Sequence, residues 1–206
     1  MYLDHGGAIV THVKISAVGR IVLASASPRR AELLKSAAID FEVMPAHLDE
    51  TAHPGEVPDR YVRRIAEAKA RAVGERAPHR IVLAADTTVV VGDEMLGKPA
   101  DDEDAKRMLR LLAGRVHAVV TGVTVLADSR AMTRVESTEV EFAPLSAEEI
   151  DWYVSTGEPR DKAGAYAIQG GASRFVTRIA GSYSNVVGLP IALVYEMLKA
   201  AGVTTP

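Results

Sequence analysis

The chain of 206 residues contains no cysteine, which excludes disulfide scaffolds, thiolate zinc sites and cysteine nucleophiles. Aromatic residues make up only 5% and the formal net charge is −3, so neither base stacking nor a global positive field favours nucleic-acid binding. No apolar run approaches the roughly 18 residues of a transmembrane helix. The first residues, MYLDHGGAIV, lack the basic and apolar regions of a secretory leader. We therefore expect a cytoplasmic protein with neither nucleic acid nor a membrane as partner.

Apolar residues make up 48% and charged residues 25% of the chain, as is ordinary for a globular protein with a sizeable core. We expect residues 1–19 to be a weakly ordered lead-in and residues 20–202 to form a single domain. Strands are expected at 20–25, 41–45, 81–85, 88–91, 116–127, 131–142 and 174–180. Helices are expected from Pro28, from Pro58 to about Arg76, from Asp101 or Asp102 to Gly114, from Ser146 to Gly157 and from Pro190 to Gly202. This order predicts an α/β fold with a mixed central sheet flanked by helices.

Residues 25–30 read SASPRR and join the first expected strand to the first expected helix. Ser27 is suited to cap that helix, and Pro28 fits its first position. A strand–turn–helix junction offers free backbone N–H groups and a positive dipole end to an anion. With the hydroxyls of Ser25 and Ser27 and the side chains of Arg29 and Arg30, it predicts a phosphate cradle. The alternative is a capped helix with two solvated arginines.

Lys69 is a second candidate for anion binding. On the helix expected from Pro58, helical spacing places Lys69 near the middle of the apolar stripe and not on the polar face. A lysine there either extends past the edge of the core into water or reaches into a cleft.

Asp86 stands between two apolar β runs, IVLAA and TVVV, and we expect it at the end of a buried strand. An unpaired buried carboxylate is costly, so Asp86 is either a metal ligand, a general base, or a turn residue satisfied by backbone N–H groups.

Further candidates lie in loops. Gly92 to Lys98 matches the spacing of a P-loop, but Pro99 follows, which lacks the hydroxyl and the N–H that such a loop needs. Lys98 and Lys162 could still meet an anion, and the amide of Gln169 could bind the edge of a base. If these cations met Arg29, Arg30 and Lys69 in one cleft, they would hold a polyphosphate, with Mg²⁺ held by Asp86 and Glu50.

Together these stretches resemble the Maf family of nucleoside triphosphate pyrophosphatases. The matching segments are SASPRR at 25–30, DET at 49–51, EAKA at 67–70, AADTTVV at 84–90, GKP at 97–99, DKAGAYAIQG at 161–170 and SYSNVVGLP at 182–190. The resemblance implies an elongated, two-lobed α/β domain with a central cleft, similar to inosine triphosphatases. It also implies hydrolysis of the α–β phosphoanhydride of a nucleoside triphosphate to a monophosphate and pyrophosphate, with Mg²⁺ or Mn²⁺.

Carried over by position, Asp86 matches the catalytic acidic residue of the family. Arg30, Thr87 and Gln169 match its specificity positions, in the combination of the branch that prefers dTTP and UTP. Family members are associated with removal of modified nucleotides and with arrest of cell division. Two features depart from the family: residues 1–19 match nothing in it, and Ala167 replaces a usual glycine.

Two other functions stay open at this point. The first is a non-catalytic nucleotide-binding regulator of division, and the second is the same enzyme acting on 7-methyl-GTP or a purine nucleotide. The last helix and the 116–142 hairpin are the surfaces we would expect to bury in a homodimer.

Overall fold

The computed structural model describes residues 21–203, so the expectations for residues 1–20 lie outside the described part. Its centre is a seven-stranded sheet in the order β2-β1-β3-β5-β6-β7, with β4 also paired to β3. The first strand is parallel to β2 and β3, and all other pairs are antiparallel, so the expected mixed α/β class is confirmed. The strands are β1 (Ile21–Leu23), β2 (Phe41–Val43), β3 (Val82–Val91), β4 (Glu94–Leu96), β5 (Val116–Ala127), β6 (Arg130–Phe142) and β7 (Val176–Ala180).

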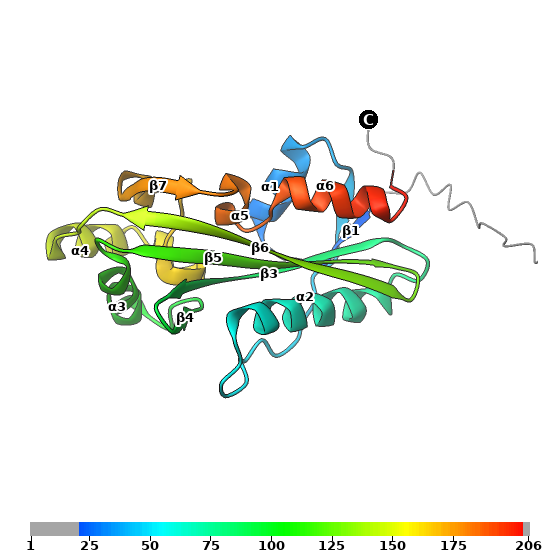
Figure 1. The fold of residues 1–206 in the computed structure, drawn as a ribbon, viewed down its shortest axis with the longest axis horizontal. Helices are drawn as coiled ribbons and strands as arrows, with labels where there is room; N and C mark the ends of the chain where they lie inside the picture. The colour runs from blue at the N-terminus through cyan, green and yellow to red at the C-terminus, as the bar shows by residue number, and fades with distance from the viewer. Residues whose placement is uncertain (1–20, 204–206) are drawn as a thin grey trace, which may run out of the picture.

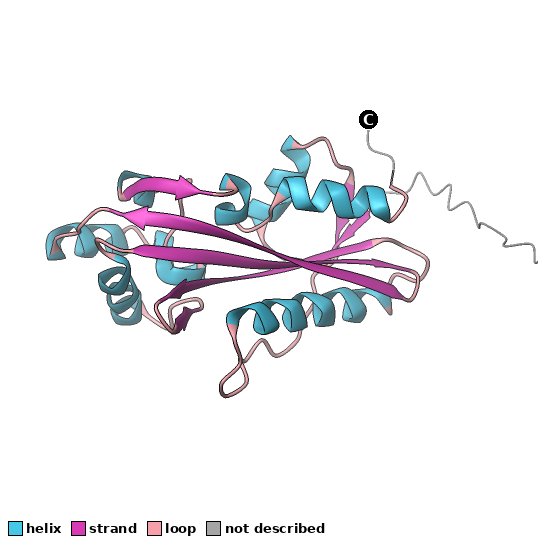
Figure 2. Ribbon diagram, viewed as in Figure 1, coloured by secondary structure: helices cyan, strands magenta, loops and turns pink. Residues whose placement is uncertain are grey.

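Helices cover both faces and one end of this elongated sheet (Figure 1). One face carries α2, the opposite face carries α1, α5 and α6, and α3 and α4 lie at one end (Figures 1 and 2). The α-helices are α1 (Pro28–Ser36), α2 (Pro58–Gly74), α3 (Asp102–Leu112), α4 (Ala147–Ser155), α5 (Tyr183–Val187) and α6 (Ile191–Ala200). The 3₁₀ turns are η1 (Glu158–Asp161), η2 (Ala163–Ala165) and η3 (Gly171–Arg174). Within the described residues, no helix is both long and apolar enough to cross a bilayer.

Strand β3 connects the three clusters of buried apolar side chains that form the core. Val89 and Val91 belong to the cluster with α3 and α4, and Leu83 and Ala85 belong to the cluster with α1 and α6. The remaining cluster lies under α2 and includes Ala84. The residues at the centre of β3 therefore lie where these clusters meet.

Helix α2 approaches the sheet very closely, because a glycine faces it. A Cβ added to Gly122 on β5 would lie 2.3 Å from the carbonyl oxygen of Val62, which is far inside van der Waals contact. The apolar stripe of α2 therefore lies deep against the sheet, and Lys69 on that stripe is only 7% exposed.

Several local predictions are confirmed. The side chain of Asp101 caps α3 by accepting from the N–H of Asp104 at 2.8 Å, and Ser146 and Glu149 form the expected capping box of α4. The 116–142 hairpin is present.

Expectations about β3 and α1 are wrong, and two short elements were not expected. Residues 81–91 are not two strands around Asp86: β3 is continuous, because Asp86 and Thr87 pair with β5. Ser27 occupies the N-cap of α1 without making a side-chain cap bond. The sequence analysis also missed β4 and the five-residue helix α5.

Candidate active site

A cavity opens along one edge of β3, where neighbouring strands leave a gap. On this edge β1 pairs with Val82 and Leu83, whereas β4 pairs only with Val89 to Val91. On the other edge, β5 pairs with β3 from Val82 to Val90. The middle of β3 is thus held firmly from one side and borders a cavity of about 610 Å³ on the other.

The structure brings every predicted site residue to this cavity. The lining includes Ser25, Ser27, Arg29, Arg30, Glu50, Lys69, Asp86, Thr87, Lys98, Lys162 and Gln169. They come from the β1–α1 junction, the loop after β2, helix α2, strand β3, the loop after β4 and the segment from η1 to η3. The expected convergence of distant cations and a carboxylate on one cleft is therefore confirmed, while the ligand of each residue stays a prediction.

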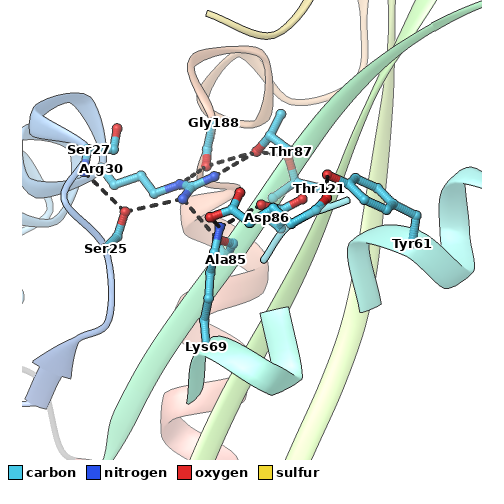
Figure 3. A network of polar contacts seen from close by, with 11 residues as sticks. Ser25, Ser27, Arg30, Tyr61, Lys69, Ala85, Asp86, Thr87, Thr121 and Gly188 are labelled. Carbon is cyan, nitrogen blue, oxygen red and sulfur yellow. Dashed lines mark hydrogen bonds and ion pairs between the residues drawn. The ribbon is translucent and has the colours of Figure 1, made fainter. Parts of the chain in front are cut away.

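Asp86 and Lys69 form the most deeply buried charged contact of this cavity (Figure 3). The Lys69 Nζ donates to Oδ1 of Asp86 at 2.7 Å and also lies 2.9 Å from Oε1 of Glu50. Asp86 is 5% exposed, and its other oxygen, Oδ2, is buried without a hydrogen-bond partner among the described residues. Lys69 thus reaches the cleft, where two carboxylates of the protein itself accept from it.

Arg30 holds the β1–α1 junction against the open edge of β3 (Figure 3). Four of its five N–H donors contact protein acceptors: the carbonyls of Gly188 and Ala85 at 2.8 Å each, Oγ of Ser25 at 3.2 Å and Oγ1 of Thr87 at 3.0 Å. Burial lowers the pKa of Arg30, and the charge of Asp86 opposes this shift. Because most of its donors are used in this way, Arg30 fixes the position of Thr87 and has little capacity left for a phosphate.

The β1–α1 junction lines the cavity with residues 24–30. Oγ of Ser25 accepts from the N–H of Ser27 at 3.2 Å, and the first N–H groups of a helix have no intrahelical acceptors. The guanidinium of Arg29 crosses to the opposite wall, where it binds Asp161 at 3.2 Å.

The opposite wall supplies two lysines and an amide. Lys162 donates to the carbonyl of Glu158 at 2.8 Å and pairs with Asp161. Lys98 and Gln169 are exposed residues of the cavity lining.

Several residues of the cavity were not singled out by sequence reasoning, among them Tyr61 and Asp161. The hydroxyl of Tyr61 donates to the carbonyl of Glu50 at 3.0 Å, and burial together with Asp86 and Glu50 raises its pKa to about 12. Asp161 ties Arg29 to Lys162 across the cleft. Tyr61 could have been found from its place on α2, eight residues before Lys69, whereas no signal distinguished Asp161 from a surface aspartate.

The carboxylates of the cavity suit a divalent cation that binds together with phosphate. Within residues 21–203, no group of three or more acidic, histidine or cysteine residues could hold a metal alone. Glu50 and Asp86 both contact Lys69, and Oδ2 of Asp86 lacks a donor. Mg²⁺ is commonly held by one or two carboxylates plus substrate phosphates and water, and these residues fit that pattern.

Fold and site together define an α/β protein whose cleft has cations on both walls, as binding of a small polyanion requires, and also contains a buried carboxylate. The sequence profile of the family described as Maf-like protein matches residues 20–201. The chain belongs to this family, as its motifs indicate.

Curated relatives resemble the chain over nearly their whole length. A protein of Anaeromyxobacter dehalogenans (strain 2CP-C) named dTTP/UTP pyrophosphatase is 55% identical, covering 91% of this chain and 96% of that protein. A Koribacter versatilis protein of the same name is 52% identical over 89% of this chain and 95% of its own length. Among solved structures, a HAM1 protein from Coxiella burnetii has a TM-score of 0.49 at 16% identity, covering 87% of this chain and 98% of that one.

Proposed function

We propose that this protein is a nucleoside triphosphate pyrophosphatase that converts dTTP and UTP to the monophosphate and pyrophosphate. The observation that carries the proposal is the buried Lys69–Asp86 pair, with an unpartnered oxygen of Asp86, in a cavity lined by cations. The names of relatives more than half identical to this chain support the same reaction.

The triphosphate binds between the two cationic walls. Arg29 and the start of α1 form one wall, and Lys98 and Lys162 form the other. A volume of about 610 Å³ falls within the range of roughly 300–1,000 Å³ usual for small-ligand sites. As the phosphoanhydride bond breaks, these cations neutralise the charge that develops on the phosphate oxygens.

Asp86 accepts the proton of the attacking water at Oδ2, while Lys69 fixes the carboxylate through Oδ1. The water oxygen bonds to the α-phosphorus, the bond to the bridging oxygen breaks, and pyrophosphate leaves. Positioning a general base in this way typically contributes about 10²–10⁴ in rate. Lys69 acts as the positioning residue of that base.

Asp86 and Glu50 are the residues that we propose to hold Mg²⁺ or Mn²⁺. When bound, the ion would lower the pKa of its water and offset phosphate charge. Glu50 reaches the cavity because Tyr61 fixes its backbone carbonyl.

The nucleobase of the substrate is recognised by Thr87 and Gln169. The hydroxyl of Thr87 is fixed by Arg30 and also lies 3.0 Å from Oγ1 of Thr121. Gln169 supplies both a donor and an acceptor, as the edge of thymine or uracil requires.

Pyrophosphate release from dTTP, UTP, 7-methyl-GTP and inosine triphosphate, each with Mg²⁺ or Mn²⁺, tests the proposal. We expect dTTP and UTP to react fastest. Faster release from 7-methyl-GTP or inosine triphosphate would identify that nucleotide as the preferred substrate instead. Tight binding of these nucleotides without release of pyrophosphate would make the protein a nucleotide-binding regulator.

A further inference from the structure

Two side chains, those of Tyr153 and Glu158, hold the backbone on both sides of Gln169. The hydroxyl of Tyr153 accepts from the N–H of Ala167 at 3.0 Å and donates to Oε1 of Glu158 at 2.6 Å. Oε2 of Glu158 accepts from the N–H of Gly171 at 3.0 Å. Residues 167 and 171 are therefore tied to one carboxylate, and Gln169 lies midway between them.

This clamp of Tyr153 and Glu158 is tightly packed. Tyr153 is fully buried and contacts Phe175 edge to face at 5.5 Å. A Cβ added to Gly170 would lie 2.2 Å from the Glu158 carboxylate, so a larger residue there would displace this carboxylate from its place in the clamp. Burial and the hydrogen bond to Glu158 raise the pKa of Tyr153, so its hydroxyl stays protonated and donates at neutral pH.

We infer that Tyr153 and Glu158 are positioning residues that set nucleobase discrimination by fixing the loop of Gln169. Neither of them is among the described residues that line the cavity, so both act through the loop and not by contact with the nucleotide. This inference rests on the proposed function, because it assigns Gln169 to the base.

The main chain and the side chain of Glu158 serve different parts of the cleft. Its carbonyl accepts from Lys162 on the phosphate side, whereas its carboxylate holds the loop on the base side. A substitution of the side chain alone therefore loosens base recognition and leaves the Lys162 contact in place.

Two variants break the clamp with little change in volume. Tyr153→Phe keeps the ring and removes the hydroxyl that bonds to Ala167 and Glu158. Glu158→Met keeps a side chain of similar length but removes both oxygens that accept from Gly171 and Tyr153.

The variants are compared with the wild type in binding of dTTP and of inorganic tripolyphosphate, which carries no base. We expect each variant to bind dTTP about tenfold more weakly, since a hydrogen bond that orders the loop is lost, and tripolyphosphate within about twofold of the wild type. KM for dTTP should rise by a similar factor, with kcat changed by less than about twofold. Amide hydrogen exchange at Ala167 and Gly171 should become faster.

Ser146→Ala is the matched control, because it removes the cap of α4, the helix that carries Tyr153, without touching the clamp. It should lower thermal stability while leaving the ratio of dTTP to tripolyphosphate affinity unchanged. The inference is overturned if the clamp variants bind dTTP like the wild type, if they lose both ligands equally, or if Ser146→Ala alters the ratio in the same way. It is also overturned if the wild type binds dTTP no more tightly than tripolyphosphate.

Failure of the proposed function has a different signature. In that case the wild type releases no pyrophosphate from any nucleotide. The effect of the clamp on dTTP binding and on hydrogen exchange is then still measured directly.

Discussion

The ammonium of Lys69 lies 2.7 Å from Oδ1 of Asp86, and the two side chains are only 9% and 7% exposed. Breaking a buried ion pair leaves an uncompensated charge in the interior. Removing either partner alone should therefore destabilise the fold, and the contact also fixes the orientation of the carboxylate that we propose as the general base.

Asp86→Asn should separate catalysis from binding. The amide oxygen can still accept from Lys69, but the side chain no longer accepts a proton from water. We expect pyrophosphate release from dTTP to fall by about 10²–10⁴, with dTTP affinity measured by calorimetry changed only severalfold. Asp151→Asn, at an exposed aspartate paired with Lys106, is the matched control and should be fully active. Near-normal turnover of Asp86→Asn would remove Asp86 from the role of base.

Lys69→Met should be strongly destabilising, because it leaves Asp86 buried without its partner. We expect a loss of about 3–5 kcal/mol in the free energy of unfolding, measured by urea denaturation. The double variant Lys69→Met/Asp86→Asn should recover part of this loss, since both charges are then absent. Strictly additive losses in the double-mutant cycle would show that the two side chains are not coupled.

Arg30→Lys should damage the site although the charge is kept. One ammonium cannot reach the four acceptors that the guanidinium binds. We expect a loss of about 2 kcal/mol in unfolding free energy from unsatisfied buried acceptors and a clear fall in kcat/KM for dTTP. Arg178→Lys, at an exposed arginine paired with Glu141, should change neither quantity, and equal behaviour of the two variants would refute the assigned role.

His117 should make the fold less stable in mild acid. Burial lowers the pKa of this ring to about 4 from an ordinary value of 6.5, so the unfolded chain binds a proton that the folded chain does not. The free energy of unfolding should therefore fall as the pH drops from about 6.5 to about 4, by about 3 kcal/mol in total.

The matched variant His117→Gln keeps a polar partner for the hydroxyl of Tyr166, which lies 2.9 Å from the ring. Its unfolding free energy, measured in urea at several pH values, should depend less on pH in this window. Carboxylates such as Glu56, whose pKa Arg64 lowers to about 2, add a pH dependence that both proteins share. Parallel curves for the two proteins would contradict the prediction.

Periodicity located the residues whose environment is decided locally. Lys69 could be predicted in the core because helical spacing alone places it on the apolar stripe of α2. The caps of α3 and α4 could be predicted because each depends on residues three positions apart. The resemblance to the Maf family added the order of the motifs and a central cleft. The convergence of the predicted cations on one cavity could be expected on that ground.

Long-range pairing decided what the sequence analysis missed. Asp86 was expected at a strand end, but β5 pairs with it from a segment more than thirty residues further along. Tyr153 and Glu158 showed no pattern of their own, because their partners at 167 and 171 become neighbours only through the path of the η1–η3 segment.

Strand β3 also determines how the enzyme should fail on heating. Its residues are shared among all three apolar clusters, so none of these regions can melt while leaving the strand undisturbed. Thermal inactivation and global loss of structure should accordingly be one cooperative event, without a folded but inactive species at intermediate temperature.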